Sequence, residues 1–205
     1  MKIICIGHNY RKHIEELGHA LPEEPLFFCK PDTALLRNND SFYIPDFTDD
    51  LQYETELVVK INRIVKSIDE KFASRCYSQV AVGIDFTARD IQRCCIEKGL
   101  PWEICKAFDK STPVPNEFKE LADFPQGIGN LHFRLDINGK TVQEGNSADM
   151  IFSVDKIIAY VSRFMTLKIG DIIFTGTPAG VGKVKIGDRL EVFLEGEKMM
   201  DFEIK

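Results

Sequence analysis

The sequence lacks long hydrophobic runs, long basic runs and paired cysteine motifs. No apolar stretch approaches the roughly 20 residues of a membrane helix, and the N-terminal run that ends before His8 is shorter than a signal-peptide core. No basic run exceeds two residues, and the net charge is −6, which disfavours binding to a phosphate backbone. We therefore expect a cytoplasmic protein without a membrane or nucleic-acid partner.

The six cysteines contain no C-x-x-C pair, so neither a zinc site nor a disulfide framework is predicted. They are Cys5, Cys29, Cys76, Cys94, Cys95 and Cys105. We expect them to be reduced and mostly buried, as small hydrophobic residues. A chain of 205 residues buries enough surface to fold as a single domain over residues 1–205 without a cross-link.

Frequent glycine and proline predict many short strands, and Asn138-Gly139 is typical of a two-residue hairpin turn. The predicted strands are Ile3–Ile6, Leu26–Cys29, Glu54–Ile61, Val80–Phe86, His132–Ile137, Thr141–Glu144, Asp171–Thr175, Arg189–Leu194 and Met199–Ile204. Helices are predicted over Tyr10–Leu17, over Ala88–Lys98 after Thr87 as N-cap, and after Ser153, where Val154, Ile157, Ile158, Val161 and Met165 form an apolar stripe. Few helices separated by many strands favour a mostly β, α+β fold with a large mixed or antiparallel sheet system.

Two glutamates alternate along the predicted strand that begins near Tyr53. Because successive side chains point to opposite faces, Glu54 and Glu56 share one face. The apolar run Leu57–Val59 predicts that the strand is buried, and two buried carboxylates must share a proton or meet a cation. The alternative is a solvated strand face at the edge of a sheet.

Asp85 follows a second apolar strand and either serves turn or helix capping or joins the two glutamates. Together the three carboxylates form a hard oxygen set that suits Mg²⁺, Mn²⁺ or Ca²⁺ rather than zinc. An ion held by three carboxylates keeps positions for water or substrate, which is typical of a catalytic site.

His13 and Glu16 lie three residues apart on the first predicted helix, where a carboxylate can fix the imidazole tautomer and raise its basicity. The pair is either a general base with its orienting group or a surface pair of little consequence. Lys106 follows the largely apolar segment Pro101–Cys105 and is either a buried cation facing an anionic intermediate or a solvated lysine.

The segment Thr175–Lys183 does not match the phosphate-binding loop, because Thr177 stands where the first glycine belongs and Val184 follows the lysine. A loop after a strand can still hold a substrate carboxylate through its amides and the Thr177 hydroxyl. A plain turn is the alternative.

Several short motifs occur together in a fixed order. They are Gly7-His8-Asn9-Tyr10 with His13 and Glu16, Phe28-Cys29-Lys30-Pro31, Tyr53-Glu54-Thr55-Glu56-Leu57, Gly83-Ile84-Asp85-Phe86-Thr87-Ala88-Arg89-Asp90, Lys98-Gly99-Leu100-Pro101-Trp102, Lys106, and Gly170-Asp171-Ile172-Ile173-Phe174-Thr175-Gly176-Thr177-Pro178. This set resembles the fumarylacetoacetate hydrolase family in its short single-domain form, which includes acylpyruvases, oxaloacetate decarboxylases and 2-hydroxyhepta-2,4-diene-1,7-dioate isomerases. The resemblance runs from Cys5 to about Val184.

The resemblance implies a mixed β-sandwich roll, a homodimer, and Mg²⁺ or Mn²⁺ bound by the residues that match Glu54, Glu56 and Asp85. It places near the substrate the residues that match Lys30, Arg89, Gln92, Lys106 and Thr177. It also implies a water-activating dyad, His13 with Glu16, on a lid-like segment within residues 1–25. The position of His8 is commonly arginine in relatives and can contact the far end of the substrate, so the identity of that end stays open.

The activity that the resemblance implies is hydrolysis of a C–C bond in acylpyruvate-type 2,4-dioxo acids, giving pyruvate and a carboxylic acid. Water activated by His13 would attack the C4 carbonyl, and Lys106 with the metal would stabilise the leaving enolate. Decarboxylation of oxaloacetate, which needs no base, and isomerisation or hydration of 2-oxo dienoic acids are alternatives on the same site. The alternative without catalysis is a 2-oxo acid binding protein.

Overall fold

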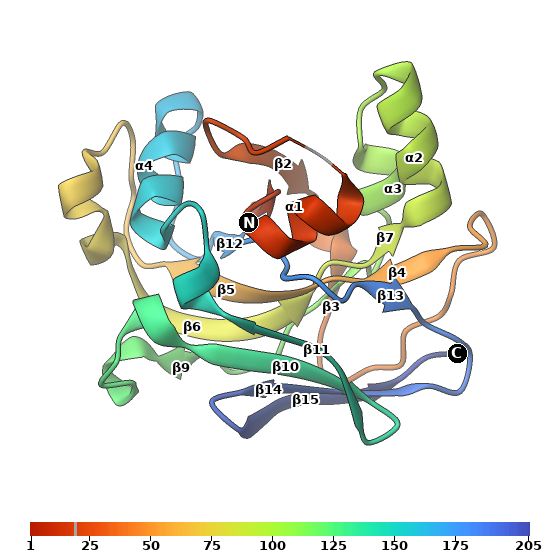
Figure 1. The fold of residues 1–205 in the computed structure, drawn as a ribbon. Coiled ribbons are helices and arrows are strands. Elements are labelled where there is room, and N and C mark those ends of the chain that lie inside the picture. Colours follow the sequence, from red (N-terminus) through yellow and green to blue (C-terminus); the bar gives the residue numbers. More distant parts are fainter. Residues whose placement is uncertain (19) are drawn as a thin grey trace.

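The computed structural model describes residues 1–18 and 20–205, and its centre is a six-stranded mixed sheet (Figure 1). In spatial order its strands are β2 (Leu26–Lys30), β1 (Ile3–Gly7), β12 (Ile172–Phe174), β5 (Thr55–Ile61), β6 (Tyr77–Ile84) and β9 (Lys119–Glu120). In this sheet β1 and β12 run parallel, and the other neighbours are antiparallel. Strand β12 therefore joins the N-terminal strand to the middle of the sheet.

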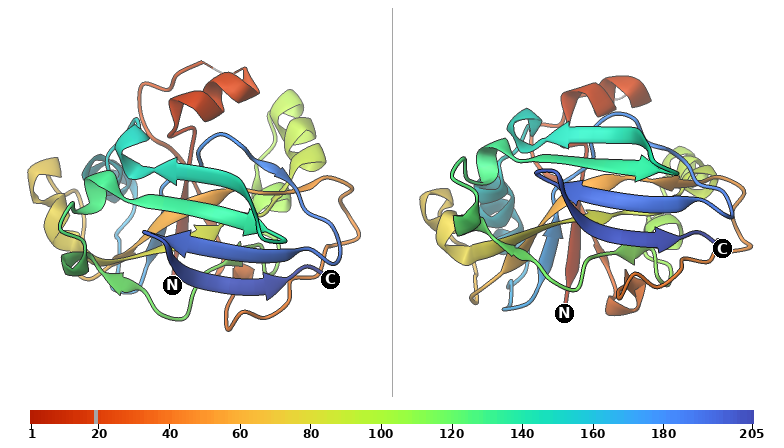
Figure 2. Two further views of the ribbon diagram at one scale, coloured as in Figure 1. Left: turned by 60° about the horizontal axis from the view of Figure 1, so that its bottom comes forward. Right: turned by 90° about the horizontal axis from the view of Figure 1, so that it is seen from below.

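A second, antiparallel sheet packs over the first, and Figure 2 shows its four strands stacked side by side. They are β11 (Lys140–Asn146), β10 (His132–Ile137), β14 (Arg189–Leu194) and β15 (Glu197–Glu203). Asn138 and Gly139 both have positive φ angles, 53° and 75°, which confirms the predicted hairpin turn. The two-layer arrangement confirms the mostly β sandwich.

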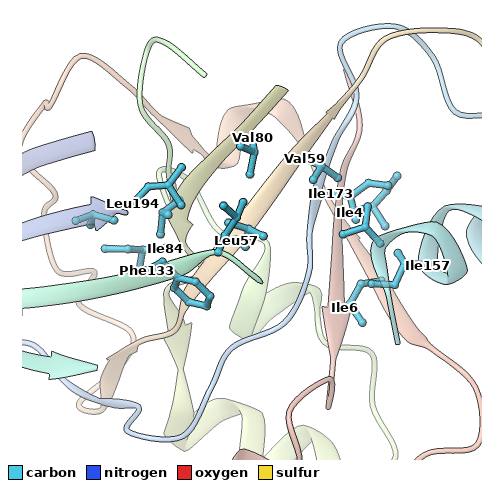
Figure 3. Close-up of a cluster of buried hydrophobic side chains, with 14 of the residues drawn as sticks. Ile4, Ile6, Leu57, Val59, Val80, Ile84, Phe133, Ile157, Ile173 and Leu194 are labelled. Carbon is cyan, nitrogen blue, oxygen red and sulfur yellow. The ribbon is translucent and has the colours of Figure 1, made fainter. Parts of the chain in front are cut away.

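The main core lies between the two sheets and continues under helix α4 (Val154–Phe164). Leu57 and Ile84 of the first sheet lie beside Phe133 of the second, and Ile157 of α4 lies beside Ile4 (Figure 3). The Ser153 hydroxyl accepts a hydrogen bond from the Lys156 amide at 3.1 Å, which confirms the predicted N-cap.

Three further helices lie near one another in Figure 1: α1 (Arg11–Leu17), α2 (Arg89–Lys98) and α3 (Glu103–Lys106). The prediction that Thr87 is the N-cap of α2 is wrong, since Ala88 occupies that position. Thr87 belongs instead to β7 (Thr87–Ala88), which pairs with β4 (Leu51–Tyr53) in a small sheet that also contains β13 (Gly182–Lys183). None of the helices in residues 1–18 and 20–205 is long and apolar enough to cross a membrane.

The strand predictions are confirmed in place: His132–Ile137 and Arg189–Leu194 match β10 and β14 residue for residue, and the others differ at their ends. Strand β5 begins one residue after Glu54, and β6 ends one residue before Asp85, so both acids stand just outside the ladder. The sequence pattern missed the two-residue strands β3 (Leu35–Leu36) and β8 (Thr112–Pro113), and the 3₁₀ turns Asp32–Ala34, Glu70–Cys76, Leu121–Asp123, Ile128–Asn130 and Ser147–Asp149. All six cysteines are free and four are buried, as expected.

Candidate active site

The three predicted metal ligands converge at one end of the β5–β6 pair. Each of Glu54, Glu56 and Asp85 is buried, and one carboxylate oxygen from each lies within 4.8 Å of the others. The register explains this, because Glu56 pairs with Gly83 and the Asp85 amide donates to the Glu54 carbonyl oxygen at 2.8 Å. The carboxylates therefore meet where the two strands end, and the solvated-face alternative for the glutamates is excluded.

Lys106 occupies the centre of this acidic cluster. Its ammonium group donates to Glu54 Oε2 at 2.7 Å, to Asp85 Oδ2 at 3.0 Å and to the Thr87 hydroxyl at 2.6 Å. An ammonium group has three donors, so all of them have partners within the protein. Burial lowers the pKa of Lys106, but the charges of Asp85 and Glu54 outweigh this and raise it above its usual value. Lys106 is therefore a buried, protonated cation.

Lys30 forms a second buried ion pair with Asp85. Its ammonium group lies 2.5 Å from Asp85 Oδ1 and donates to the carbonyl and hydroxyl oxygens of Ser111, both at 3.2 Å. Lys30 does not line the cavity, whereas the other residues predicted to bind substrate do. The structure thus places Lys30 against a carboxylate of the acidic cluster and outside the lining of the cavity.

Arg89 opens helix α2 and faces Glu54. Its guanidinium donates to Glu54 Oε1 at 2.5 Å, to the Gln92 side-chain oxygen at 2.5 Å and to the Gln52 side-chain oxygen at 2.9 Å. Five N–H donors are available and three are used, so two remain for a bound anion. Gln92, one helical turn along, keeps its amide nitrogen as a further donor.

The carboxylates differ in how they are neutralised. Burial raises the pKa of Glu54, but Lys106 and Arg89 outweigh burial and hold the pKa well below its usual range. Burial, Asp85 and Glu54 all raise the pKa of Glu56, whose carboxylate is 2.7 Å from the Gly176 amide and has no ion pair with any cation in residues 1–18 and 20–205. A buried carboxylate that lacks a cation, beside two others, fits a hard divalent ion such as Mg²⁺ or Mn²⁺.

The predicted base lies on α1, beside the same cavity. His13 is buried, and its Nδ1 is 3.2 Å from Glu16 Oε2, which also lies 3.3 Å from the Gly180 amide. Burial lowers the pKa of His13, although Glu54 and Glu16 oppose this, so the imidazole is neutral near pH 7. His13 is therefore not a surface residue, although Glu16 is exposed, and α1 is tied to the loop that follows β12.

The positions of β1 and α1 limit the predicted lid to a shorter part of residues 1–25. Strand β1 is an inner, buried strand of the central sheet, so within residues 1–25 the covering segment is the part after Gly7. His8 begins that part with a φ of 57° and lines the cavity. His19, which falls within the predicted lid-like segment of residues 1–25, lies outside the described residues.

The Thr177 hydroxyl lines the cavity but already has two partners. It donates to the Thr55 carbonyl oxygen at 3.0 Å and accepts from the Gln143 side-chain nitrogen at 2.8 Å. Gln143 extends from β11 in the second sheet, and its oxygen accepts from the Thr55 amide at 2.9 Å. The Thr177 hydroxyl proton is thus already used in a hydrogen bond within the protein. Gln143 also fixes the loop after β12 against the strand that carries Glu54 and Glu56.

The cavity is small, about 30 Å³, and one wall is apolar. Sequence reasoning assigned no site role to Phe28, Ile96 and Trp102, which form that wall, or to Gln52, Ser111 and Gln143, which hold site residues in place. Phe28 and Trp102 occur within the quoted motifs, so those motifs could have indicated them. Nothing local in the sequence marks Gln52, Ser111 or Gln143.

The chain is similar to known proteins over almost its whole length. The chain is 40% identical over 198 residues to the oxaloacetate tautomerase YcgM of Escherichia coli, covering 97% of this chain and 90% of that protein. It is 40% identical over 203 residues to the mitochondrial oxaloacetate tautomerase FAHD1 of Bos taurus, covering 99% of this chain and 91% of that protein. The structure of a fumarylpyruvate hydrolase from Pseudomonas aeruginosa, in complex with Mn²⁺ and pyruvate, matches with a TM-score of 0.92 and 33% identity, covering 100% of this chain and 89% of that one.

The family model described as fumarylacetoacetate (FAA) hydrolase C-terminal matches residues 2–204, almost the entire chain. Its extent agrees with the β-sandwich observed here and with the ordered motifs that surround the acidic cluster. The chain therefore belongs to the fumarylacetoacetate hydrolase C-terminal family.

Proposed function

We propose that this protein is a divalent-metal-dependent enzyme that transfers a proton at C3 of a small 2-oxo acid, interconverting the keto and enol forms of oxaloacetate. The observation that carries the proposal is the position of His13, a neutral base that lines the same cavity as the three carboxylates. The oxaloacetate tautomerases among the relatives support a four-carbon substrate.

The acidic cluster of Glu54, Glu56 and Asp85 would hold Mg²⁺ or Mn²⁺. When bound, such an ion supplies Lewis acidity that polarises a carbonyl oxygen and makes the neighbouring C–H bond more acidic. Lys106 and Lys30 keep the cluster assembled by neutralising Glu54 and Asp85.

His13 would carry the proton. Because Nδ1 faces the Glu16 carboxylate, we assign the proton of the neutral ring to Nδ1, which leaves the lone pair of Nε2 as the base. Nε2 accepts a proton from C3 as the electron pair of the C–H bond forms the C2=C3 double bond and the C2 carbonyl π pair moves onto its oxygen, and the same proton can then return to that oxygen to give the enol. Glu16 stabilises the imidazolium between these two transfers.

Arg89 and Gln92 would hold a substrate carboxylate. Two guanidinium donors of Arg89 and the amide nitrogen of Gln92 are available at the cavity, while the remaining donors of Arg89 are fixed by Glu54, Gln52 and Gln92. A pre-oriented fork of this kind places C3 of the substrate relative to His13.

Hydrolysis of acylpyruvates is the second candidate, favoured by the likeness to the fumarylpyruvate hydrolase structure. In that reaction His13 takes a proton from water, the resulting hydroxide adds to the C4 carbonyl, and the C3–C4 bond breaks. Its electron pair remains on the pyruvate half, which is then protonated at C3. The same base and the same carboxylate fork serve both reactions, so the substrate decides between them.

Three assays of the purified protein separate the candidates. The enol absorbance of oxaloacetate reports tautomerisation, pyruvate release from oxaloacetate reports decarboxylation, and pyruvate release from acetylpyruvate reports hydrolysis. We expect metal-dependent acceleration in the first assay, lost with a chelator and restored by Mn²⁺. Acceleration of acetylpyruvate cleavage alone would replace the tautomerase proposal with the hydrolase, and no turnover in any assay would contradict both.

The variant His13→Asn should lose about 10²- to 10⁴-fold in kcat for tautomerisation, the usual contribution of a positioned base. Its Mn²⁺ affinity should stay unchanged, since His13 makes no hydrogen bond to Glu54, Glu56 or Asp85 among the described contacts. Calorimetric titration with Mn²⁺ beside the absorbance assay measures both quantities. Full activity in the variant would remove His13 from the reaction, and decarboxylation that persists in it would show that this side reaction needs no base.

The pH dependence of kcat/KM should show an acid limb below pH 6.5. The reaction requires neutral His13, and burial lowers the pKa of this residue from its usual 6.5, so activity falls as pH decreases through that lowered pKa. In the variant Glu16→Gln the opposing contribution of the carboxylate is lost, and the limb should move to still lower pH. An acid limb above pH 7 in the wild type would contradict the assignment.

A further inference from the structure

We infer that Asn9 is a positioning residue that fixes the proposed metal ligand Glu56 and the base-bearing helix α1 relative to each other. This inference rests on the proposed metal site. Asn9 lies between β1 and α1 and is fully buried. No catalytic or binding role follows for it from the mechanism above, although it belongs to the motif Gly7-His8-Asn9-Tyr10.

The Asn9 side chain joins two loops that are distant in the sequence. Its nitrogen donates to the carbonyl oxygens of Thr175 at 2.7 Å and Phe152 at 3.1 Å, and its oxygen accepts from the Phe152 amide at 2.7 Å. Its own carbonyl oxygen accepts from the Ile151 amide at 2.9 Å. Because the bonds run in both directions, they fix the orientation of the amide as well as its position.

The bond to Thr175 connects Asn9 to Glu56. The peptide after Thr175 carries the Gly176 amide, which donates to Glu56 Oε2 at 2.7 Å. Gly176 has a φ of 99°, and a Cβ built on it would lie 2.7 Å from the Asn9 Cβ, so Asn9 also packs directly against this peptide. The Thr175 carbonyl and the Gly176 amide belong to the same peptide plane, so Asn9 sets the direction of the N–H that orients Glu56.

The same residue also anchors α1. Tyr10 follows directly, forms a bridge with Met150, and provides the carbonyl oxygen that accepts the first helical bond, from Ile14. His13 and Glu16 lie on the helix that begins there. Outer-shell partners of metal ligands typically contribute 10- to 100-fold to metal affinity. Asn9 therefore orients Glu56 through the Thr175–Gly176 peptide, and it positions His13 by fixing the beginning of helix α1.

The test is Mn²⁺ titration of the full-length protein and its variant Asn9→Ala by calorimetry, together with the chemical shift of the Gly176 amide. We expect about a 10-fold weaker Mn²⁺ affinity and a displaced Gly176 resonance in the metal-free variant. The matched control is Ser162→Ala, which removes a buried hydroxyl that bonds the Ile68 amide and the Ala159 carbonyl oxygen in another part of the fold. The control should lose stability without a change in Mn²⁺ affinity.

The outcomes distinguish the proposed metal site from the proposed role of Asn9. Wild-type protein that binds no Mn²⁺ would overturn the metal assignment, and the Gly176 shift would then test Asn9 alone. Unchanged Mn²⁺ affinity and an unchanged Gly176 shift in Asn9→Ala would overturn the role of Asn9. If Asn9→Ala does not fold, Asn9→Ser, whose hydroxyl can serve one of the three backbone groups, is tested against the same expectations.

Discussion

Replacing Glu56 with glutamine is expected to eliminate metal-dependent turnover and, at the same time, to stabilise the metal-free protein. Loss of a ligand carboxylate should lower Mn²⁺ affinity by more than about 100-fold, beyond what outer-shell changes cause. Turnover should fall by about 10³-fold or more, because several kcal/mol of transition-state stabilisation depend on the ion. Glutamine keeps the shape of the side chain and its acceptor for the Gly176 amide.

The stabilising half of this prediction follows from the crowding of like charges. Burial, Asp85 and Glu54 raise the pKa of Glu56, so the folded protein binds more protons at this residue than the unfolded chain. Stability of the metal-free wild type therefore decreases as pH rises from the ordinary glutamate pKa toward the raised one. The glutamine variant lacks this decrease and should melt at least about 2 °C higher at pH 8, the shift that about 1 kcal/mol causes in a chain of this size.

Melting curves with and without Mn²⁺ measure both effects. The exposed substitution Glu117→Gln removes the same charge away from the site and should change neither metal affinity nor the pH dependence. A metal-free Glu56→Gln variant that melts below the wild type would contradict the interpretation of Glu56 as the carboxylate without a cation.

The variant Lys106→Met is expected to destabilise the metal-free protein by about 3–5 kcal/mol, the usual result of removing one partner from a buried ion pair. Lys106 donates to both Glu54 and Asp85, and the substitution leaves Arg89 on Glu54 and Lys30 on Asp85 as their remaining cations. Divalent metal supplies positive charge to the same carboxylates. We therefore expect Mn²⁺ to stabilise the variant more than it stabilises the wild type.

Urea denaturation at neutral pH, with and without Mn²⁺, tests this expectation. The control Lys119→Met removes an exposed ion pair with Glu197 and should change stability little in either condition. Equal stabilisation of wild type and Lys106→Met by Mn²⁺ would show that Lys106 and the ion do not act on the same charges.

The alternation of Glu54 and Glu56 and the apolar strand before Asp85 indicated an acidic cluster, because strand periodicity determines which side chains share a face, but the same pattern also fitted a solvated strand face and a capping role for Asp85. The helix α4 and the Asn138-Gly139 hairpin were predictable for the same reason, since their signals are local. The burial of His13 and Lys106 was not predictable, because the local sequence also fits an exposed His13–Glu16 pair and a solvated Lys106. Only packing against other elements decides between these alternatives.

Long-range contacts account for what the sequence did not reveal. Gln143 reaches Thr55 and Thr177 from another sheet, and Ser111 fixes Lys30 from a segment 81 residues away. The short strands β7 and β13 exist because they pair with β4, and two-residue segments carry no periodic signal of their own. The mistaken N-cap at Thr87 has the same origin, since pairing in β7 places this residue before the helix boundary.

The place of β12 in the central sheet also determines when the protein can fold during synthesis. This strand, near residue 173, separates β1 from β5, so the six-stranded sheet has a gap in its middle until the segment Ile172–Phe174 has left the ribosome. Contacts between such distant segments form slowly, and the loop that binds Glu56 follows β12 directly. The nascent chain therefore completes its central sheet and its acidic cluster together, only after β12 has emerged.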